Sequence, residues 1–178
     1  MHSVYSRVNN VSATLSTIVM VLLSAIAISS FVFAPHPTGS IEVTSVKVFA
    51  GEARRYPHRR QEHAFVTFNL TADLSTLFNW NTKQLFLYLE AEYNNAKGVR
   101  NEVIFWDRIV RRKEDAVIAV SGKNKYPFRE VSAKFKGSTP ANYTLKYNLM
   151  PFVGILTYGE AARVTGPIEF PLARDRVE

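Results

Sequence analysis

The stretch VSATLSTIVMVLLSAIAISSFVF, residues 11–33, is the longest apolar segment of this 178-residue chain. It lies inside a longer run, between Arg7 and Glu42, that has no charged residue. An α-helix of this length rises ~35 Å at ~1.5 Å per residue, which is enough to cross a hydrocarbon core ~30 Å thick. The sequence therefore predicts either one transmembrane helix or a signal peptide that is still attached.

Length and flanking residues favour a retained anchor over a cleaved signal peptide. A signal peptide has an apolar region of about 7–15 residues, followed by a cleavage site with small side chains. Residues 25–27, Ala-Ile-Ala, have suitable side chains but lie inside the apolar segment. A cut after Ala34 would place Pro35 next to the cleaved bond, and proline there should block cleavage. We therefore predict a signal-anchor helix over residues 11–33.

The charges beside the helix predict its orientation. Arg7 precedes the helix, whereas Glu42 follows it and comes before the first lysine, Lys47. Positively charged residues near a membrane span remain on the cytosolic side. We expect a cytosolic tail over residues 1–10 and one domain over residues 34–178, in the lumen or outside the cell.

The domain has the pattern of an all-β fold. Its apolar residues recur with a period of two in short segments that are rich in β-branched and aromatic side chains. These segments cover residues 41–49, 65–70, 84–93, 103–110, 116–120, 143–149 and 164–170. Turn residues separate them at positions 96–98, 121–123 and 137–140. Seven or eight strands with such breaks predict an antiparallel β-sandwich.

Three segments carry more specific expectations. The alternation slips at Thr44-Ser45, which a β-bulge would absorb. Residues 73–79 begin with a capping aspartate, Asp73, and suit a short helical turn. Residues 84–93 are apolar at successive positions, so we predict a strand that is buried on both faces.

The aromatic residues divide into a predicted core and a predicted contact surface. Phe86, Tyr88 and Trp106 are expected in the core, because aromatic side chains bury large areas. Trp80 lies between two asparagines in a turn, where contact with a partner or with the membrane interface is more plausible.

The net charge is +7, and the densest basic cluster lies at residues 54–60. Such a run is either a solvated loop or a contact for acidic lipid headgroups or an acidic partner, and a domain beyond the membrane is not expected to bind nucleic acid. We predict a partner interface that includes Trp80, Lys83, Arg54 and Arg55. The chain has no cysteine, so the fold does not rely on disulfides.

The chain shows little sign of catalytic or metal chemistry. It has no Gly-x-Ser-x-Gly elbow, glycine-rich phosphate loop or His-Glu-x-x-His pair. His58 and His63 flank the basic cluster, and with Glu62 they provide too few ligands for a metal. We therefore predict no enzyme and no cofactor, while a Ser/His/Asp triad dispersed along the chain stays open as an alternative.

Two glycosylation sequons lie in the domain. They begin at Asn69 and Asn142, and each has an allowed middle residue. Asn69 lies inside a predicted strand, so its side chain would have to point outward to carry a glycan.

Several of these segments together resemble a known family. They are residues 68–74, 78–81, 83–89, 91–93, 106–110, 142–145 and 151–156, and they follow a short tail with one arginine and a single span. In this order they are similar to the subunit 3 family of the eukaryotic signal peptidase complex. The resemblance covers nearly the whole chain and is most specific at residues 71–93.

The resemblance implies a non-catalytic accessory glycoprotein of the endoplasmic reticulum membrane, a single-pass type II protein with a lumenal domain. Its implied partners are a membrane-anchored serine peptidase subunit that removes signal peptides, the small membrane subunits of the same complex and the bilayer, with the translocon as a further candidate. In the family, the sequon that matches Asn142 is the usual glycan site, whereas Asn69 falls where relatives have an acidic residue.

A different class of protein would fit part of the same pattern. A freestanding lumenal or secreted β-sandwich could bind a carbohydrate or protein ligand through exposed aromatic residues such as Trp80 and Tyr56. That alternative requires a soluble mature chain, or an anchor without a stable membrane partner.

Overall fold

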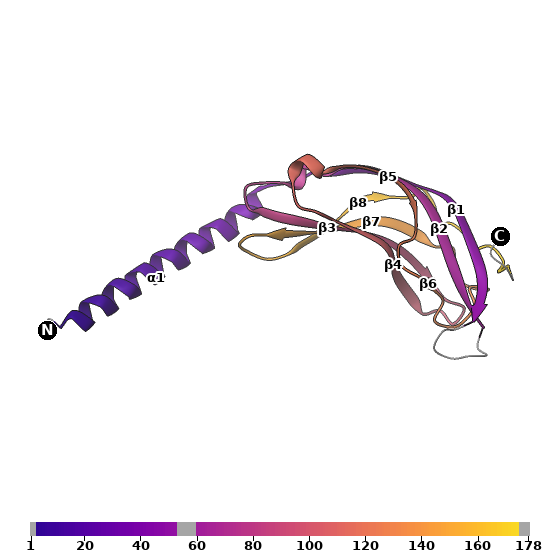
Figure 1. Ribbon diagram of the computed structural model, residues 1–178, viewed down its shortest axis with the longest axis horizontal. Helices are drawn as coiled ribbons and strands as arrows, with labels where there is room; N and C mark the ends of the chain where they lie inside the picture. Colours follow the sequence, from indigo (N-terminus) through magenta and orange to yellow (C-terminus); the bar gives the residue numbers. More distant parts are fainter. Residues whose placement is uncertain (1–2, 53–59, 175–178) are drawn as a thin grey trace.

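The protein, in a computed structural model, is a long helix followed by a β-domain, and the structure describes residues 3–52 and 60–174. Helix α1 (Val4–Ser29) continues as the 3-10 turn η1 (Ser30–Val32), and α1 projects from one end of the domain (Figure 1). Ser3 begins the helix, because its side chain accepts a hydrogen bond from the Ser6 backbone N–H at 3.3 Å. Among the described residues, α1 with η1 is the one helix long and apolar enough to cross a membrane.

The β-domain consists of two antiparallel sheets. The first sheet has the order β1-β2-β5, with β6 also paired to β2, and the second has the order β4-β3-β7-β8. The strands are β1 (Thr38–Glu52), β2 (Arg60–Asp73), β3 (Thr82–Asn94), β4 (Arg100–Val110), β5 (Val117–Lys123), β6 (Phe128–Arg129), β7 (Asn142–Pro151) and β8 (Thr157–Arg163). Two further 3-10 turns, η2 (Ser75–Leu77) and η3 (Lys113–Asp115), lie between strands.

The alternation in the sequence sets the inner faces of both sheets. In β2, Val66, Phe68 and Leu70 are buried, and the residues between them are more exposed, as the pattern predicted. The register of β1 on β2 shifts between Val43 and Ser45, which confirms the expected bulge.

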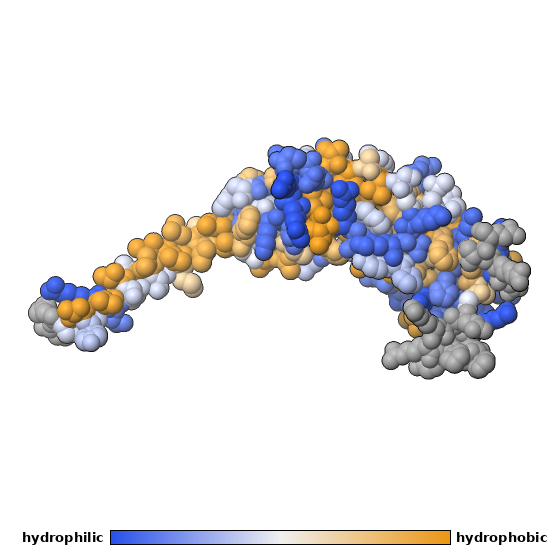
Figure 2. Space-filling view, in the orientation of Figure 1, coloured by the Kyte–Doolittle hydropathy of each residue, from blue (hydrophilic) through white to orange (hydrophobic). Residues whose placement is uncertain are grey.

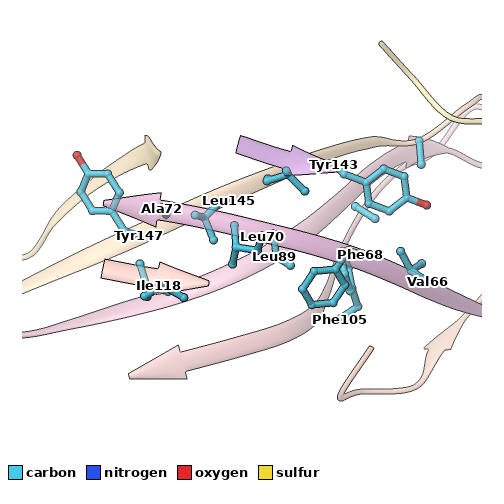
Figure 3. Close-up of a cluster of buried hydrophobic side chains, with 14 of the residues drawn as sticks. Val66, Phe68, Leu70, Ala72, Leu89, Phe105, Ile118, Tyr143, Leu145 and Tyr147 are labelled. Carbon is cyan, nitrogen blue, oxygen red and sulfur yellow. The ribbon is translucent and has the colours of Figure 1, made fainter. Parts of the chain in front are cut away.

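The core lies between the two sheets (Figure 3). Phe68 from the first sheet contacts Phe105 from the second edge-on, with 5.8 Å between ring centroids. Leu87 and Leu145 of the second sheet are also fully buried. Each such side chain contributes about 1.5–3 kcal/mol on burial. The all-β prediction, an antiparallel sandwich behind one N-terminal helix, is confirmed.

An aromatic cluster closes the end of the sandwich that lies away from α1. Phe170 stacks on Phe135 with ring centroids 4.4 Å apart, and it also contacts Tyr93 and Phe128. Phe170 belongs to the segment 164–170, which was predicted to be a strand, and that prediction is wrong. Its backbone forms an isolated bridge between Ala141 and Ile168, and the Val164 N–H donates to the Tyr143 carbonyl at 3.0 Å, without forming a strand.

The last strand is instead β8, which the pattern missed. Apart from Tyr158, this edge strand consists of small and polar residues, so it shows no apolar alternation. Residues 121–123 were predicted to form a turn but belong to β5, where Gly122 pairs with Phe68. Pairing with the central strand therefore overrides the turn preference of that glycine.

Strand β3 is fully buried on one face only, so the expectation of burial on both faces is wrong. Leu85, Leu87 and Leu89 face the core, whereas Phe86 and Tyr88 are half-buried on the outer face. The reason is that no other described element covers this side of the sheet. Trp106 is also only partly buried, and it packs against Phe68.

The predicted helical turn at residues 73–79 is present as η2. The Asp73 carboxylate accepts a hydrogen bond from the Ser75 N–H at 2.9 Å. The Ser75 side chain, and then this backbone bond, lower the pKa of Asp73. The turn leads directly into β3 and places residues 79–82 beside the end of α1.

Candidate functional site

The helix and the domain are joined through one buried asparagine, Asn81, just before β3. Its side-chain amide donates hydrogen bonds to the Ser30 hydroxyl at 2.7 Å and to the Val153 carbonyl at 2.8 Å. Its side-chain oxygen accepts the Val153 N–H at 3.1 Å, and its backbone carbonyl accepts the Phe152 N–H at 2.8 Å. Ser30 is the C-cap of α1. Asn81 therefore connects the end of the helix to the segment before β3 and to the turn that follows β7.

The turn between β7 and β8 packs against the last turns of α1. A β-carbon placed on Gly154 would lie 3.5 Å from the Ala27 β-carbon, and Gly154 has a φ of +120°, which favours glycine. Ile26, Ala27, Ser29 and Ser30 are partly covered, whereas the earlier apolar turns of α1 are exposed. The domain therefore contacts the helix along its last turns as well as at its end.

A cavity lies in this junction. Its volume is about 330 Å³, and its walls come from the end of α1, the segment before β1, η2, and strands β7 and β8. Apolar side chains such as Phe31, Leu149 and Ile155 form part of the lining, together with Asn79 and Thr157. The composition of the walls suits an apolar group with few polar contacts.

The outer face of the second sheet has an aromatic patch near the junction, formed by Phe86, Tyr88, Ile109 and Tyr158. The rings of Phe86 and Tyr88 stack with centroids 5.6 Å apart. Ile109 on β4 is the cross-strand partner of Phe86 on β3. Asn148 on β7 pairs with Phe86 on one side and with Tyr158 on the other. The aromatic patch thus draws its residues from β3, β4 and β8, with Asn148 of β7 between Phe86 and Tyr158.

Farther from α1, the same face is charged. Glu90, Glu92 and Glu102 have carboxylate oxygens within 4.8 Å of one another, a spacing that could hold a metal ion. Protein cations already occupy this cluster, because Lys146 contacts Glu90 at 2.7 Å and Arg100 contacts Glu92 at 2.9 Å and Glu102 at 2.7 Å. The hydrogen bond from Lys146 to Glu90 raises the pKa of Lys146. The arrangement is that of an ion-pair network.

The predicted interface residues fall into two groups. Trp80 is 58% exposed and lies next to Asn81, and Lys83 is exposed at the start of β3, so both lie at the junction. Arg54 and Arg55 lie outside the described residues, as do His58 and Tyr56. Of the four predicted residues, Trp80 and Lys83 are thus the two that the structure describes, and both are exposed near the end of α1.

The second histidine of the predicted pair, His63, lies half-buried in β2. Its cross-strand partners are Phe49 on β1 and Arg129 on β6. Burial, and then the positive charge of Arg129, lower the pKa of His63. The neighbouring Glu62 carboxylate accepts the Phe135 N–H at 2.6 Å, which fixes a loop.

Both sequon asparagines are exposed. Asn69 points outward from the middle of β2, between Glu42 on β1 and Ser121 on β5. Asn142 begins β7 at the end of the sheet away from α1, where it pairs with Glu92.

Sequence reasoning missed Asn81, the turn between β7 and β8, and Tyr158. Asn81 gave a weak signal, because it lies in the segment that carries the family resemblance, but nothing in its neighbours indicated burial. Tyr158 lies in the edge strand that the alternation did not reveal.

Comparison with known proteins gives a consistent family. The family model described as SPC22, signal peptidase subunit, matches residues 1–173. Proteins named signal peptidase complex subunit 3 are similar to the chain, including one from Gallus gallus with 36% identity over 158 residues, which cover 88% of this chain and 87% of the relative. The Homo sapiens protein of that name is 35% identical over 162 residues, again 88% of this chain and 87% of the relative.

The Saccharomyces cerevisiae protein of the same name is 45% identical over 104 residues. This match spans 57% of the chain and about half the length of that relative, 56%. Together with the β-sandwich and its N-terminal apolar helix, these matches show that the chain belongs to the signal peptidase subunit family.

Proposed function

We propose that the chain is a non-catalytic accessory subunit of the signal peptidase complex, which supports removal of signal peptides from nascent secretory and membrane proteins. In this proposal, α1 spans the endoplasmic reticulum membrane once, the tail before it is cytosolic and the β-sandwich is lumenal. As a member of this family, the chain has other components of the complex as partners. The catalytic serine peptidase subunit and the small membrane subunits are the specific partners that we propose.

The observation that carries the proposal is the attachment of a folded domain to the end of an apolar helix. Asn81 joins the two by hydrogen bonds to Ser30 and Val153. The covalent link is short as well, because η1 ends at Val32 and β1 begins at Thr38. Pro35 and Pro37 stiffen this link. Such a domain holds a fixed height above the bilayer.

A fixed height is useful to a peptidase that cleaves close to a membrane. The sandwich would pack on the lumenal part of the catalytic subunit and hold its active site at one distance from the bilayer. The span would form part of the wall of the pocket that measures the length of a signal helix.

The surroundings of His63 support a non-catalytic role. A catalytic histidine in a serine peptidase is oriented by a carboxylate, which stabilises its charged form. His63 instead faces Arg129, whose charge disfavours protonation, and the nearby Glu62 carboxylate binds the Phe135 backbone. These contacts suit a structural histidine.

The aromatic patch is the surface that we propose for contact with the catalytic subunit. Stacked, partly exposed aromatic rings are typical of the centres of protein interfaces. A glycan on Asn142, at the far end of β7, would confine the contact to the part of this face near the anchor.

The experiment loosens the attachment and measures cleavage of a reporter precursor in microsomes whose complex contains the variant. One variant carries a flexible Gly/Ser insert between Ala34 and Pro35 together with Asn81→Ala. The control carries the same insert between Lys97 and Gly98, an exposed turn of the domain. We expect slower cleavage or lower recovery of the complex for the first variant only. Equal processing by both would contradict the proposal.

Affinity capture through an N-terminal tag tests the assembly itself. We expect a full-length, glycosylated chain together with a membrane serine peptidase. A tagged fragment that lacks the domain would show that the apolar segment is cleaved, and the secreted ligand-binding alternative would replace the proposal.

A further inference from the structure

We propose that the turn between β7 and β8, residues 152–156, is a second membrane contact that inserts into the lipid beside α1. This inference rests on the proposed span of α1. It gives the β-domain a direct contact with the bilayer, in the leaflet that faces the domain.

The position of the turn follows from its packing on the helix. Gly154 lies against Ala27, which belongs to the apolar anchor segment. At ~1.5 Å per residue, Ala27 precedes the end of η1 at Val32 by about 8 Å along the helix. Figure 1 shows the turn that joins β7 to β8 reaching back toward α1, beyond the start of β3. If the span includes Ala27, Gly154 lies at the same depth.

The chemistry of the turn suits lipid. Phe152 is 67% exposed and Ile155 is 66% exposed, and Leu156 beside them is also exposed. Residues 147–159 contain no charged side chain. Three large apolar side chains at the tip of one turn form the kind of exposed patch that marks a membrane or protein contact. Figure 2 shows the apolar surface of α1 running up to this end of the domain.

The turn is held at this depth by hydrogen bonds. The Asn81 side chain both donates to and accepts from the Val153 backbone, and its carbonyl accepts the Phe152 N–H. These bonds hold the turn backbone, while the Phe152 and Ile155 side chains stay exposed. The turn cannot withdraw from the helix without breaking them.

Neighbouring residues mark the level of the membrane interface. Trp80 adjoins Asn81 and is largely exposed, and Lys83 follows on the same segment. Tryptophan is enriched where headgroups meet the hydrocarbon core, and lysine extends its ammonium group toward the headgroups. A bilayer therefore explains the apolar turn, the indole and the ammonium group together, with the apolar turn deepest.

The experiment uses single cysteines in the full chain, which has none of its own. Ile155→Cys and Phe152→Cys are spin-labelled, and the chain is reconstituted into phosphatidylcholine vesicles. Accessibility to oxygen, which concentrates in lipid, is compared with accessibility to a water-soluble nickel chelate. Val21→Cys in α1 is the membrane reference, and Val131→Cys is the matched control, because Val131 is an 81% exposed apolar residue in another loop.

We expect labels at positions 155 and 152 to show an oxygen-to-nickel ratio close to that at position 21, and several-fold above that at position 131. The inference would be overturned if position 21 lies in lipid while the oxygen-to-nickel ratio at both turn positions equals that at position 131. The proposed function would remain intact in that case. Nickel access at position 21 would overturn the span, and with it both proposals. Labels that become shielded from both reagents only in the assembled complex would show a protein partner on the turn, and would also overturn the inference.

Discussion

The side-chain amide of Asn81 lies 2.7 Å from the hydroxyl of Ser30, so a buried residue of the domain is hydrogen-bonded to the residue that ends the apolar helix. The same amide group binds Val153. The junction is therefore a hydrogen-bonded unit, and its stability can be tested apart from that of the core.

Replacing Asn81 with alanine should cost about 2–4 kcal/mol of unfolding free energy, because the Val153 backbone and the Ser30 hydroxyl lose their partners. Ser30→Ala removes one bond of the same unit, so we expect about 0.5–1.5 kcal/mol for it. Urea unfolding of the full chain in detergent micelles, followed by tryptophan fluorescence, measures both. Equal costs for the two variants would show that the Val153 bonds contribute little.

The core between the sheets can be tested with two neighbours on β4. Phe105→Ala should cost about 3–5 kcal/mol, because it opens a cavity next to Phe68 and Tyr143. Ile104 points to the outer face, so Ile104→Ala should cost less than about 1 kcal/mol. The same unfolding measurement applies. A large effect at position 104 would mean that the outer face is covered in the isolated chain.

The buried carboxylate of Glu130 provides a third test. It accepts hydrogen bonds from the Tyr93 hydroxyl, from the Ser132 N–H at 2.9 Å and from the Ser132 hydroxyl at 2.7 Å. Burial, and then the bond to Glu130, raise the pKa of Tyr93. Tyr93→Phe should cost about 1–3 kcal/mol, because the carboxylate loses a donor in a site without water access.

Tyr126→Phe is the matched control for Tyr93→Phe. The Tyr126 hydroxyl also donates to a carboxylate, that of Asp107 at 2.8 Å, but this pair lies at the surface. Water replaces the lost bond there, so we expect less than about 1 kcal/mol. A cost as large as that of Tyr93→Phe would contradict the importance of burial.

His63 should make the stability of the domain depend on pH. Its folded-state pKa is lowered, so the unfolded chain takes up the proton first. The contribution of neutral His63 to the free energy of unfolding is fully present above its unfolded pKa of about 6.5. It declines as the pH falls through that value toward the folded pKa. In urea titrations between about pH 7.5 and pH 5, His63→Gln should lose less stability than the parent chain.

Arg129→Gln should weaken the same pH dependence, because the Arg129 charge contributes to the lowered pKa of His63. If the curves of the parent chain and of His63→Gln ran parallel throughout this range, His63 would not be the responsible group.

The glycan prediction tests the orientation of the domain. We expect endoglycosidase H to shift the parent chain from microsomes, Asn142→Gln to abolish the shift, and Asn69→Gln to leave it. Asn142 stands at the end of a strand, whereas Asn69 lies in the middle of a paired sheet. If endoglycosidase H does not shift the gel mobility of the parent chain, the result would contradict glycosylation of Asn142 in a lumenal domain.

Local patterns were enough to predict much of the fold. The apolar segment predicted α1, and the alternation around Phe68 predicted both β2 and its inner face. The slip of the alternation at Thr44-Ser45 predicted the bulge in β1, because a one-residue slip must be absorbed to keep the same face inward.

The sequence predicted less where distant residues decide the structure. Strand β8 forms because β7 offers an edge, and its own small residues give no periodic signal. Phe86 and Tyr88 look like core residues in the sequence, but no other described element covers their side of the sheet. Asn81 acts on Ser30 and Val153, which lie 51 and 72 positions away, so only the folded chain shows its role.

The closing contacts of the sandwich also set an order for its biogenesis. Phe170 packs on Tyr93, Phe128 and Phe135, and the backbone of Arg174 pairs with the first strand through hydrogen bonds to Val48 and Ala50. The first strand and the last described residues must therefore meet before the domain is complete. A ribosome releases helix α1 long before it releases residue 174, so the helix emerges first and the domain can close only after residue 174 has followed.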